Sequence, residues 1–101
     1  MLPIALVGDS YDDGDTQSAG SSSVTALYLP VARVGDMTTG HTCSPGTAPP
    51  VAIATGSSAV TANYLPIARV GDTHAGHMCP GETVNHIGTL VTGASGVTAG
   101  G

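Results

Sequence analysis

A 17-residue segment occurs twice in this chain, and its two copies lie 36 residues apart. The segments 20–36 and 56–72 are identical at 14 of their 17 positions. Both contain a Gly-Ser-Ser turn signal, a Val-Thr-Ala triplet, the tripeptide Tyr-Leu-Pro and the run Ala-Arg-Val-Gly-Asp. A repeat of this period corresponds to one supersecondary unit that must bury its apolar face against its neighbours. The repeat therefore constrains the architecture before any other feature is considered.

A third copy of the unit is divided between the two chain ends. Residues 1–9 match the second half of the unit, with Leu6 in place of the Arg, and residues 93–99 match the first half. An open solenoid carries atypical capping repeats at both ends, whereas a closed ring can complete its last unit from both termini. We therefore predict that residues 97–101 pair beside residues 1–7.

The predicted fold is all-β, with three pseudo-three-fold repeats closed by the chain termini. The whole chain, 1–101, is expected to form one domain whose repeats cover about 20–55, 56–92, and 93–101 joined with 1–19. Short strands bounded by Gly, Ser, Pro or Asp support this class, and no segment has a capped helical periodicity. The expected strands are 24–28, 30–34, 51–55, 60–64, 66–70, 89–92 and 97–99.

The composition indicates a thin core. The chain has no Phe or Trp and 15 Gly in 101 residues, so burial must come from many small side chains. Tyr28 and Tyr64 recur in register and are interpreted as packing residues. A core this light usually requires a covalent or metal cross-link.

The net charge is −5. This charge disfavours nucleic acid and anionic membrane surfaces as partners. No apolar stretch approaches the ~20 residues of a membrane-spanning helix, and the N-terminus lacks the pattern of a signal peptide. We expect the chain to be made in the cytoplasm.

Three variable excursions separate the repeated segments, at 10–19, 37–55 and 73–92. Equivalent excursions from a three-fold ring leave on the same side and converge on one point. The predicted shape is therefore a cone-shaped pyramid, with a flat base and an apex where the excursions meet.

All four His and both Cys lie in the second and third excursions. His and Cys are the preferred ligands of structural zinc, which is closed and four-coordinate. Our predicted ligands for a zinc ion near the apex are His41, His77, Cys79 and His86. His41 and His77 share a repeat position, and Cys79 lies two residues after His77, so an extended chain would turn both side chains to one face.

Several alternatives to this ligand set stay open. Cys43 could replace Cys79, and His74 could replace one of the imidazoles. Cys43 and Cys79 are equivalent positions of neighbouring repeats and could instead form a disulfide, although a cytoplasmic origin argues against one. The His and Cys residues could also be incidental surface groups. The acidic run 12–15 lacks the spacing of a calcium loop, and we interpret it as a solvated loop.

With the repeats and ligands in view, the chain resembles PAAR-repeat proteins, the small tips of contractile injection machines. Segments 28–36 and 64–72 resemble the family's Pro-Ala-Ala-Arg motif, with Val31 and Ile67 in place of the first Ala. Segment 37–43 resembles the loop that follows this motif. The resemblance implies a pseudo-three-fold pyramid with zinc held near the vertex by three His and one Cys.

The resemblance also implies a function without catalysis. The base of such proteins caps the trimeric β-helical spike of a type VI secretion system or a contractile phage tail, and sharpens it for membrane piercing. The chain would assemble in the cytoplasm and then cross the target membrane at the tip, with only transient membrane contact. Effector or adaptor proteins could bind the loops.

Two other functions compete with this interpretation. A small zinc-dependent hydrolase would need an open coordination position and a general base, and Glu82 is the only Glu in the chain. No His-Glu-x-x-His motif is present. A β-solenoid that binds ice or glycans would need a long regular strand ladder, which the unequal excursions interrupt.

Overall fold

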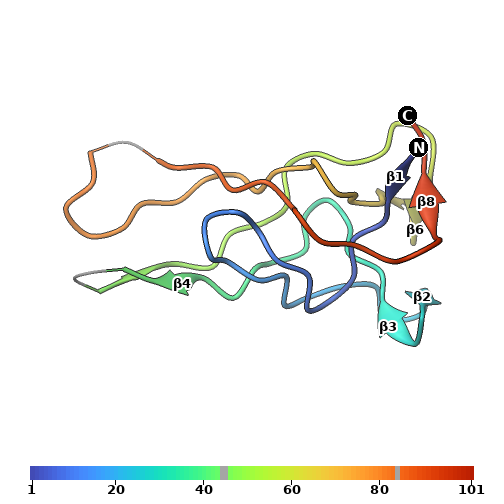
Figure 1. Ribbon diagram of the computed structural model, residues 1–101, viewed down its shortest axis with the longest axis horizontal. Coiled ribbons are helices and arrows are strands. Elements are labelled where there is room, and N and C mark those ends of the chain that lie inside the picture. Colours follow the sequence, from blue (N-terminus) through green and yellow to red (C-terminus); the bar gives the residue numbers. More distant parts are fainter. Residues whose placement is uncertain (44–45, 84) are drawn as a thin grey trace.

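The computed structural model describes residues 1–43, 46–83 and 85–101, and these residues form an all-β body (Figure 1). The class predicted from the sequence is confirmed. Among the described residues there is no helix, and hence none long and apolar enough to cross a membrane. The body is elongated, with principal extents of 38 × 24 × 22 Å. Its strands are β1 (Leu2–Pro3), β2 (Thr25–Ala26), β3 (Leu29–Pro30), β4 (His41–Thr42), β5 (Thr47–Ala48), β6 (Thr61–Ala62), β7 (Leu65–Pro66) and β8 (Thr98–Ala99).

Three antiparallel strand pairs in equivalent register, two of them hairpins, form one end of the molecule, which we call the base. Strand β2 pairs with β3, β6 pairs with β7, and the N-terminal β1 pairs with the C-terminal β8. The same Ala-to-Leu pairing occurs in each strand pair: Ala26 with Leu29, Ala62 with Leu65, and Ala99 with Leu2. The two termini therefore build the third strand pair, as predicted, and lie together in Figure 1.

Three buried alanines connect the repeats through a cycle of backbone hydrogen bonds. The N–H of Ala5 donates to the carbonyl of Ala68 (2.8 Å), that of Ala32 donates to Ala5 (2.9 Å), and that of Ala68 donates to Ala32 (3.0 Å). All three are fully buried. Bridges flank the cycle in the same pattern, joining Ile4 to Arg69, Leu6 to Val31, and Arg33 to Ile67. The pseudo-three-fold closure of the whole chain and its cone-shaped outline stay predictions.

The strands are shorter than the sequence suggested. Segments 51–55 and 89–92 contribute isolated bridges instead of strands. The reason is that each segment around the alanine cycle pairs with one neighbouring segment for only one or two residues and then pairs with another. The repeated prolines fit this arrangement because they lack an N–H and serve as acceptors: Pro3, Pro30 and Pro66 accept from Val70, Val7 and Val34. No strand among the described residues exceeds two residues, so that part of the chain offers no β-solenoid ladder.

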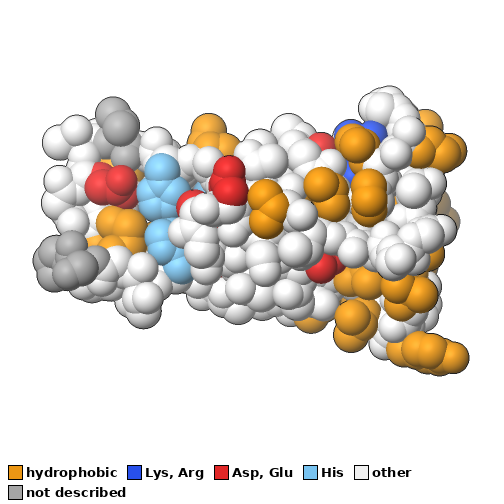
Figure 2. Space-filling model, viewed as in Figure 1, with side chains coloured by type: hydrophobic (Ala, Val, Ile, Leu, Met, Phe, Trp, Pro, Cys, Tyr) orange, Lys and Arg blue, Asp and Glu red, His pale blue; other side chains and the backbone are white. Residues whose placement is uncertain are grey.

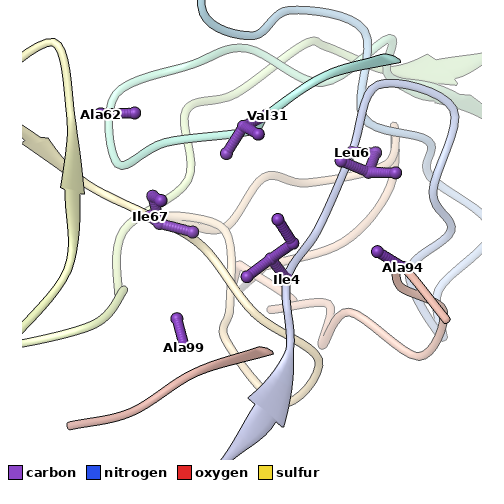
Figure 3. Packing of buried hydrophobic residues seen from close by; sticks show 7 residues of the cluster. All are labelled: Ile4, Leu6, Val31, Ala62, Ile67, Ala94 and Ala99. Carbon is purple, nitrogen blue, oxygen red and sulfur yellow. The ribbon is translucent and has the colours of Figure 1, made fainter. Parts of the chain in front are cut away.

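The core consists of two small clusters on opposite sides of the alanine cycle. One cluster, shown in Figure 3, contains Ile4, Leu6, Val31, Ala62, Ile67, Ala94 and Ala99. The other contains Ala5, Tyr11, Ala32, Ile53, Ala68 and Leu90. Alternation along each ring strand produces this division, because successive side chains point to opposite faces. As the composition indicated, most of the buried side chains are small.

Each of the two arginines forms an ion pair with the aspartate three residues later in its own repeat. Arg33 Nε lies 2.9 Å from Asp36 Oδ2, and Arg69 Nε lies 3.0 Å from Asp72 Oδ2. Arg69 also donates to the carbonyl of Gly100 at 3.0 Å, which ties the C-terminus to the ring. Leu6, at the equivalent position, keeps only the backbone hydrogen bond to the aspartate: its N–H donates to Asp9 Oδ2 at 2.7 Å.

Candidate metal centre

The three excursions converge, as the sequence predicted. Bridges join the first excursion to the second at Gln17 and Thr38, and the second to the third at Ile53 and His74. A further bridge joins the third to the first at Leu90 and Tyr11. In Figure 2 the histidines gather on the part of the molecule remote from the base. The excursions thus form a second body of structure beyond the alanine cycle.

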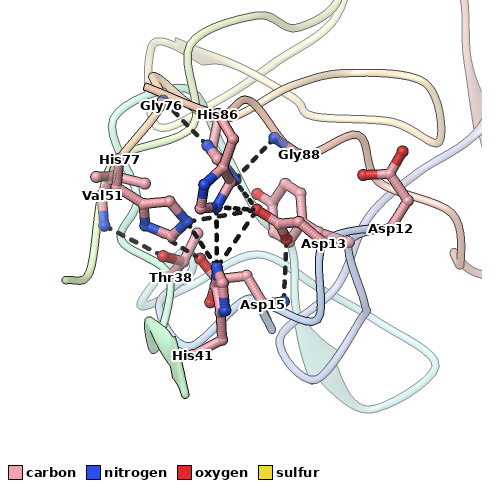
Figure 4. Close-up of polar contacts among 12 residues, drawn as sticks. Asp12, Asp13, Asp15, Thr38, His41, Val51, Gly76, His77, His86 and Gly88 are labelled. Carbon is pink, nitrogen blue, oxygen red and sulfur yellow. Dashed lines mark hydrogen bonds and ion pairs between the residues drawn. The ribbon is translucent and has the colours of Figure 1, made fainter. Parts of the chain in front are cut away.

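Three of the predicted ligands meet through their Nε2 atoms (Figure 4). His41 Nε2 lies 3.1 Å from His77 Nε2 and 3.0 Å from His86 Nε2. Zinc–nitrogen bonds of about 2.0–2.1 Å in a tetrahedron separate the donor atoms by about 3.3–3.4 Å. The histidine spacing therefore suits one small divalent ion.

The other ring nitrogen of each histidine faces an acceptor. Nδ1 of His77 lies 2.6 Å from the carbonyl of Pro49, Nδ1 of His86 lies 3.1 Å from Glu82 Oε1, and Nδ1 of His41 lies 3.3 Å from the carbonyl of Thr42. Carbonyl and carboxylate oxygens only accept, so each Nδ1 carries the proton and each Nε2 presents a lone pair. Metal-ligating histidines usually have this arrangement. Three lone pairs at this spacing repel one another unless a cation lies among them.

A carboxylate from the first excursion joins the same group, and the sequence analysis missed it. Asp13 Oδ2 lies 3.3 Å from His77 Nε2, 3.2 Å from His86 Nε2 and 3.8 Å from His41 Nε2. The interpretation of residues 12–15 as a solvated loop is wrong for its inner members, because Asp15 is only 1% exposed. Register did not reveal Asp13, because it follows Asp9 by four residues whereas His41 follows the equivalent Asp36 by five.

The surroundings of Asp13 keep it ionised. Burial opposes the charged form, but the hydrogen bonds from His74 and from the Asp15 N–H outweigh burial and lower the pKa of Asp13 below its usual value. His74 Nε2 lies 2.8 Å from Asp13 Oδ2, and Gly88 N–H also approaches this nitrogen at 2.9 Å. His74 Nδ1 accepts from Gly76 N–H at 3.0 Å. His74 therefore contacts the carboxylate from outside the three converging imidazoles.

The structure corrects the expectation for Cys79. Cys43 and Cys79 form a disulfide, with their Cα atoms 5.9 Å apart. Zinc binds the thiolate form of cysteine, and a disulfide sulfur offers none. The argument against a disulfide relied on cellular location, whereas the equivalent positions of the two residues in neighbouring repeats bring them together. The disulfide joins the same two excursions that supply the three histidines.

The Glu82 carboxylate is hydrogen-bonded to His86 and to the backbone. Its Oε1 accepts from Cys79 N–H at 2.5 Å and from His86 Nδ1 at 3.1 Å. The Cys79 N–H, followed by His86, lowers the pKa of Glu82 below its usual value. A carboxylate with two donors and a lowered pKa is a weak general base, so the hydrolase interpretation gains no support here.

A comparison with models of known protein families gives one match. The family model described as the PAAR motif matches residues 7–77, a range that holds both complete Ala-Arg-Val-Gly-Asp segments together with Asp13, His41 and His77. No curated protein sequence gives a match. The motif covers well over half of the chain, so this protein belongs to the PAAR motif family.

Proposed function

We propose that this chain is a non-enzymatic tip that caps a trimeric β-helical spike in a contractile injection machine, either a type VI secretion system or a contractile phage tail. A structural zinc ion would hold its excursions together. The observation that carries the proposal is the base: three strand pairs in the same register, in a chain of the PAAR motif family. One chain thereby offers three equivalent surfaces, as a trimeric partner requires.

The base presents apolar side chains to solvent. The equivalent leucines Leu2, Leu29 and Leu65 are 44%, 44% and 39% exposed, and Tyr28 and Tyr64 are almost fully exposed. Figure 2 shows hydrophobic side chains gathered at this end. The expectation that the two tyrosines pack within the chain was wrong. Exposed apolar patches of this kind mark protein interaction sites, and this patch supports docking to the spike.

The turns at the base retain strained residues. Leu27 and Tyr28 have φ values of 52° and 69°, and Asn63 and Tyr64 have the same two values. Two-residue hairpin turns with positive φ at both positions favour Asn-Gly, so Tyr at the second position costs stability. Strain of this kind persists mainly at functional sites. The exposed tyrosines are therefore candidates for direct contact with the spike.

The same proposal covers location and further partners. The tip would assemble on the spike in the cytoplasm and then pass through the target membrane with transient contact only. The excursions lie at the end away from the base, where effector or adaptor proteins could bind while the base stays docked. Nucleic acid is not a proposed partner, in line with the net charge of −5.

Light scattering of the chain mixed with the trimeric spike protein of the same machine tests the proposal. We expect a mass corresponding to one tip chain and three spike chains. Leu29→Asp combined with Leu65→Asp should abolish this complex because both charges would enter the apolar interface. Val91→Asp is the matched control, since Val91 is 52% exposed in the third excursion. Absence of the complex with the unaltered chain would contradict the proposal.

A further inference from the structure

We infer that Asp13 is the fourth ligand of the metal centre, which is therefore a His₃Asp site independent of the two cysteines. The inference rests on the structural metal of the proposed function and deepens it by assigning the donor set. It also brings the first excursion, which lacks His and Cys, into the cross-link.

The first argument is geometric. Five donor separations among Asp13 Oδ2 and the Nε2 atoms of His41, His77 and His86 are 3.0, 3.1, 3.2, 3.3 and 3.8 Å. A tetrahedral ion with bonds of about 2.0–2.1 Å requires about 3.3–3.4 Å. Among the described residues, the other groups with metal-ligand spacing that contain a cysteine each include only one of these three histidines.

The second argument is that the fold makes room for the Asp13 carboxylate. A Cβ atom placed on Gly88 would lie 2.7 Å from both Cγ and Oδ1 of Asp13, and 2.6 Å from His74 Nε2. Asp15 N–H donates to Asp13 Oδ1 at 3.0 Å, while His74 Nε2 contacts Oδ2. The carboxylate is thus held from two sides, with Gly88 behind it.

The third argument concerns buried charge. Asp15 Oδ2 is buried without a hydrogen-bond partner and lies 4.0 Å from His77 Nδ1. The Asp13 side chain is only 13% exposed. Burying two carboxylates in so poorly solvated a place carries a cost that needs compensation. A divalent cation among the four donors compensates it.

The assignment has a consequence for metal choice and for redox behaviour. Three imidazoles and a carboxylate suit zinc and also cobalt or nickel, and they need no soft thiolate. The Cys43–Cys79 disulfide and the metal can then be present together. Oxidation of the cysteines would leave metal occupancy unchanged, so the excursions carry two independent cross-links.

The test is to load the full chain with cobalt(II) and to measure metal content and the absorption spectrum. We expect one cobalt per chain, visible bands of a tetrahedral ion, and no thiolate-to-cobalt charge-transfer band in the near ultraviolet. The Cys43→Ser/Cys79→Ser double variant should keep the same stoichiometry and spectrum. Asp13→Asn should lower cobalt and zinc affinity by about 100-fold or more, beyond the loss typical of outer-shell partners.

Two further variants guard against an effect on folding alone. Asp12→Asn is the matched control, because Asp12 is an exposed neighbour outside the donor group, and its affinity should stay within about twofold. Gly88→Ala keeps Asp13 but crowds it and should lower affinity about 10-fold, as loss of outer-shell support does.

A charge-transfer band that disappears in the double Cys variant would overturn the inference, as would unchanged affinity in Asp13→Asn. The mass of the complex with the spike separates this result from the proposed function. If a thiolate proves to be the ligand while the one-to-three complex forms, only the donor assignment fails. If the complex is absent while the His₃Asp spectrum is present, only the proposed function fails.

Discussion

The base and the excursions are stabilised in different ways. In the base, the same pairing occurs three times, through strand pairs of nearly identical sequence and the cycle of alanine hydrogen bonds. In the excursions, which differ in length and composition, the links include residues without an equivalent in the other repeats, such as Asp13 and His86, and one disulfide. The comparison teaches that repeated backbone pairing determines the structure of the base, whereas individual side-chain contacts determine that of the excursions.

This difference predicts where the molecule is vulnerable. Backbone contacts in the base are numerous and individually weak, so loss of one should be tolerated. The excursions depend on a few strong links, so removal of one should loosen the whole upper part while the ring persists. The experiments below test that contrast.

Metal removal should have the largest effect. Structural zinc contributes on the order of 10 kcal/mol in small zinc modules, and the three imidazoles face one another with unpaired Nε2 atoms without it. Chelation at neutral pH should lower the melting temperature markedly. Hydrogen exchange should show loss of protection in the excursions, with retained protection at the amides of Ala5, Ala32 and Ala68. An unchanged melt, or equal loss in both regions, would break the comparison.

Loss of the disulfide should have the next largest effect. Cys43 and Cys79 are 36 residues apart in sequence, and a loop of that length corresponds to about 3–4 kcal/mol of chain entropy in the unfolded state. Urea unfolding of the Cys43→Ser/Cys79→Ser variant should show this decrease in the free energy of unfolding. Reductant should destabilise the unaltered chain in the same direction and leave the double variant unaffected. Equal stability of the two proteins would show that the disulfide is not an independent cross-link.

The two regions also differ in how far the sequence predicted them. The 36-residue repeat and the divided third copy predicted the pairing of the termini, because equivalent segments adopt equivalent structure. His41, His77 and His86 could be predicted as a group because imidazoles cluster in two aligned excursions. The sequence did not favour the disulfide, because a cytoplasmic origin argued against it although the two cysteines are equivalent repeat positions. It did not indicate Asp13 as a ligand, because Asp13 is a carboxylate in an excursion without His or Cys. Strand lengths failed because each ring strand divides its bonds between two neighbours.

Overpacking the alanine cycle tests the base directly. Ala32 is fully buried, so Ala32→Val adds two methyl groups where backbone strands approach through hydrogen bonds. Such overpacking typically costs about 1–3 kcal/mol. Denaturant unfolding should show this loss for Ala32→Val and little change for Ala54→Val, since Ala54 is exposed. Metal stoichiometry should stay at one per chain in both variants, and loss of metal in Ala32→Val would show that the two regions are not separable.

The smallest effect on stability is expected at the base turns, and its sign is opposite. Tyr64 has a φ of 69° and is 98% exposed, so its ring gains nothing in the isolated chain while its backbone is strained. A left-handed residue with a Cβ costs roughly 1–2 kcal/mol, which glycine would relieve. Glycine also loses more conformational freedom on folding, and this loss offsets about 0.5–1 kcal/mol of the gain. Tyr64→Gly should therefore stabilise the chain by about 0.5–1 kcal/mol in denaturant unfolding, whereas Tyr64→Ala, which removes the ring but keeps the strain, should not. Both variants should bind the spike more weakly than the unaltered chain, because the ring is missing in each. A Tyr64→Gly variant that is more stable and still binds with full affinity would show that the strained turn serves neither folding nor docking.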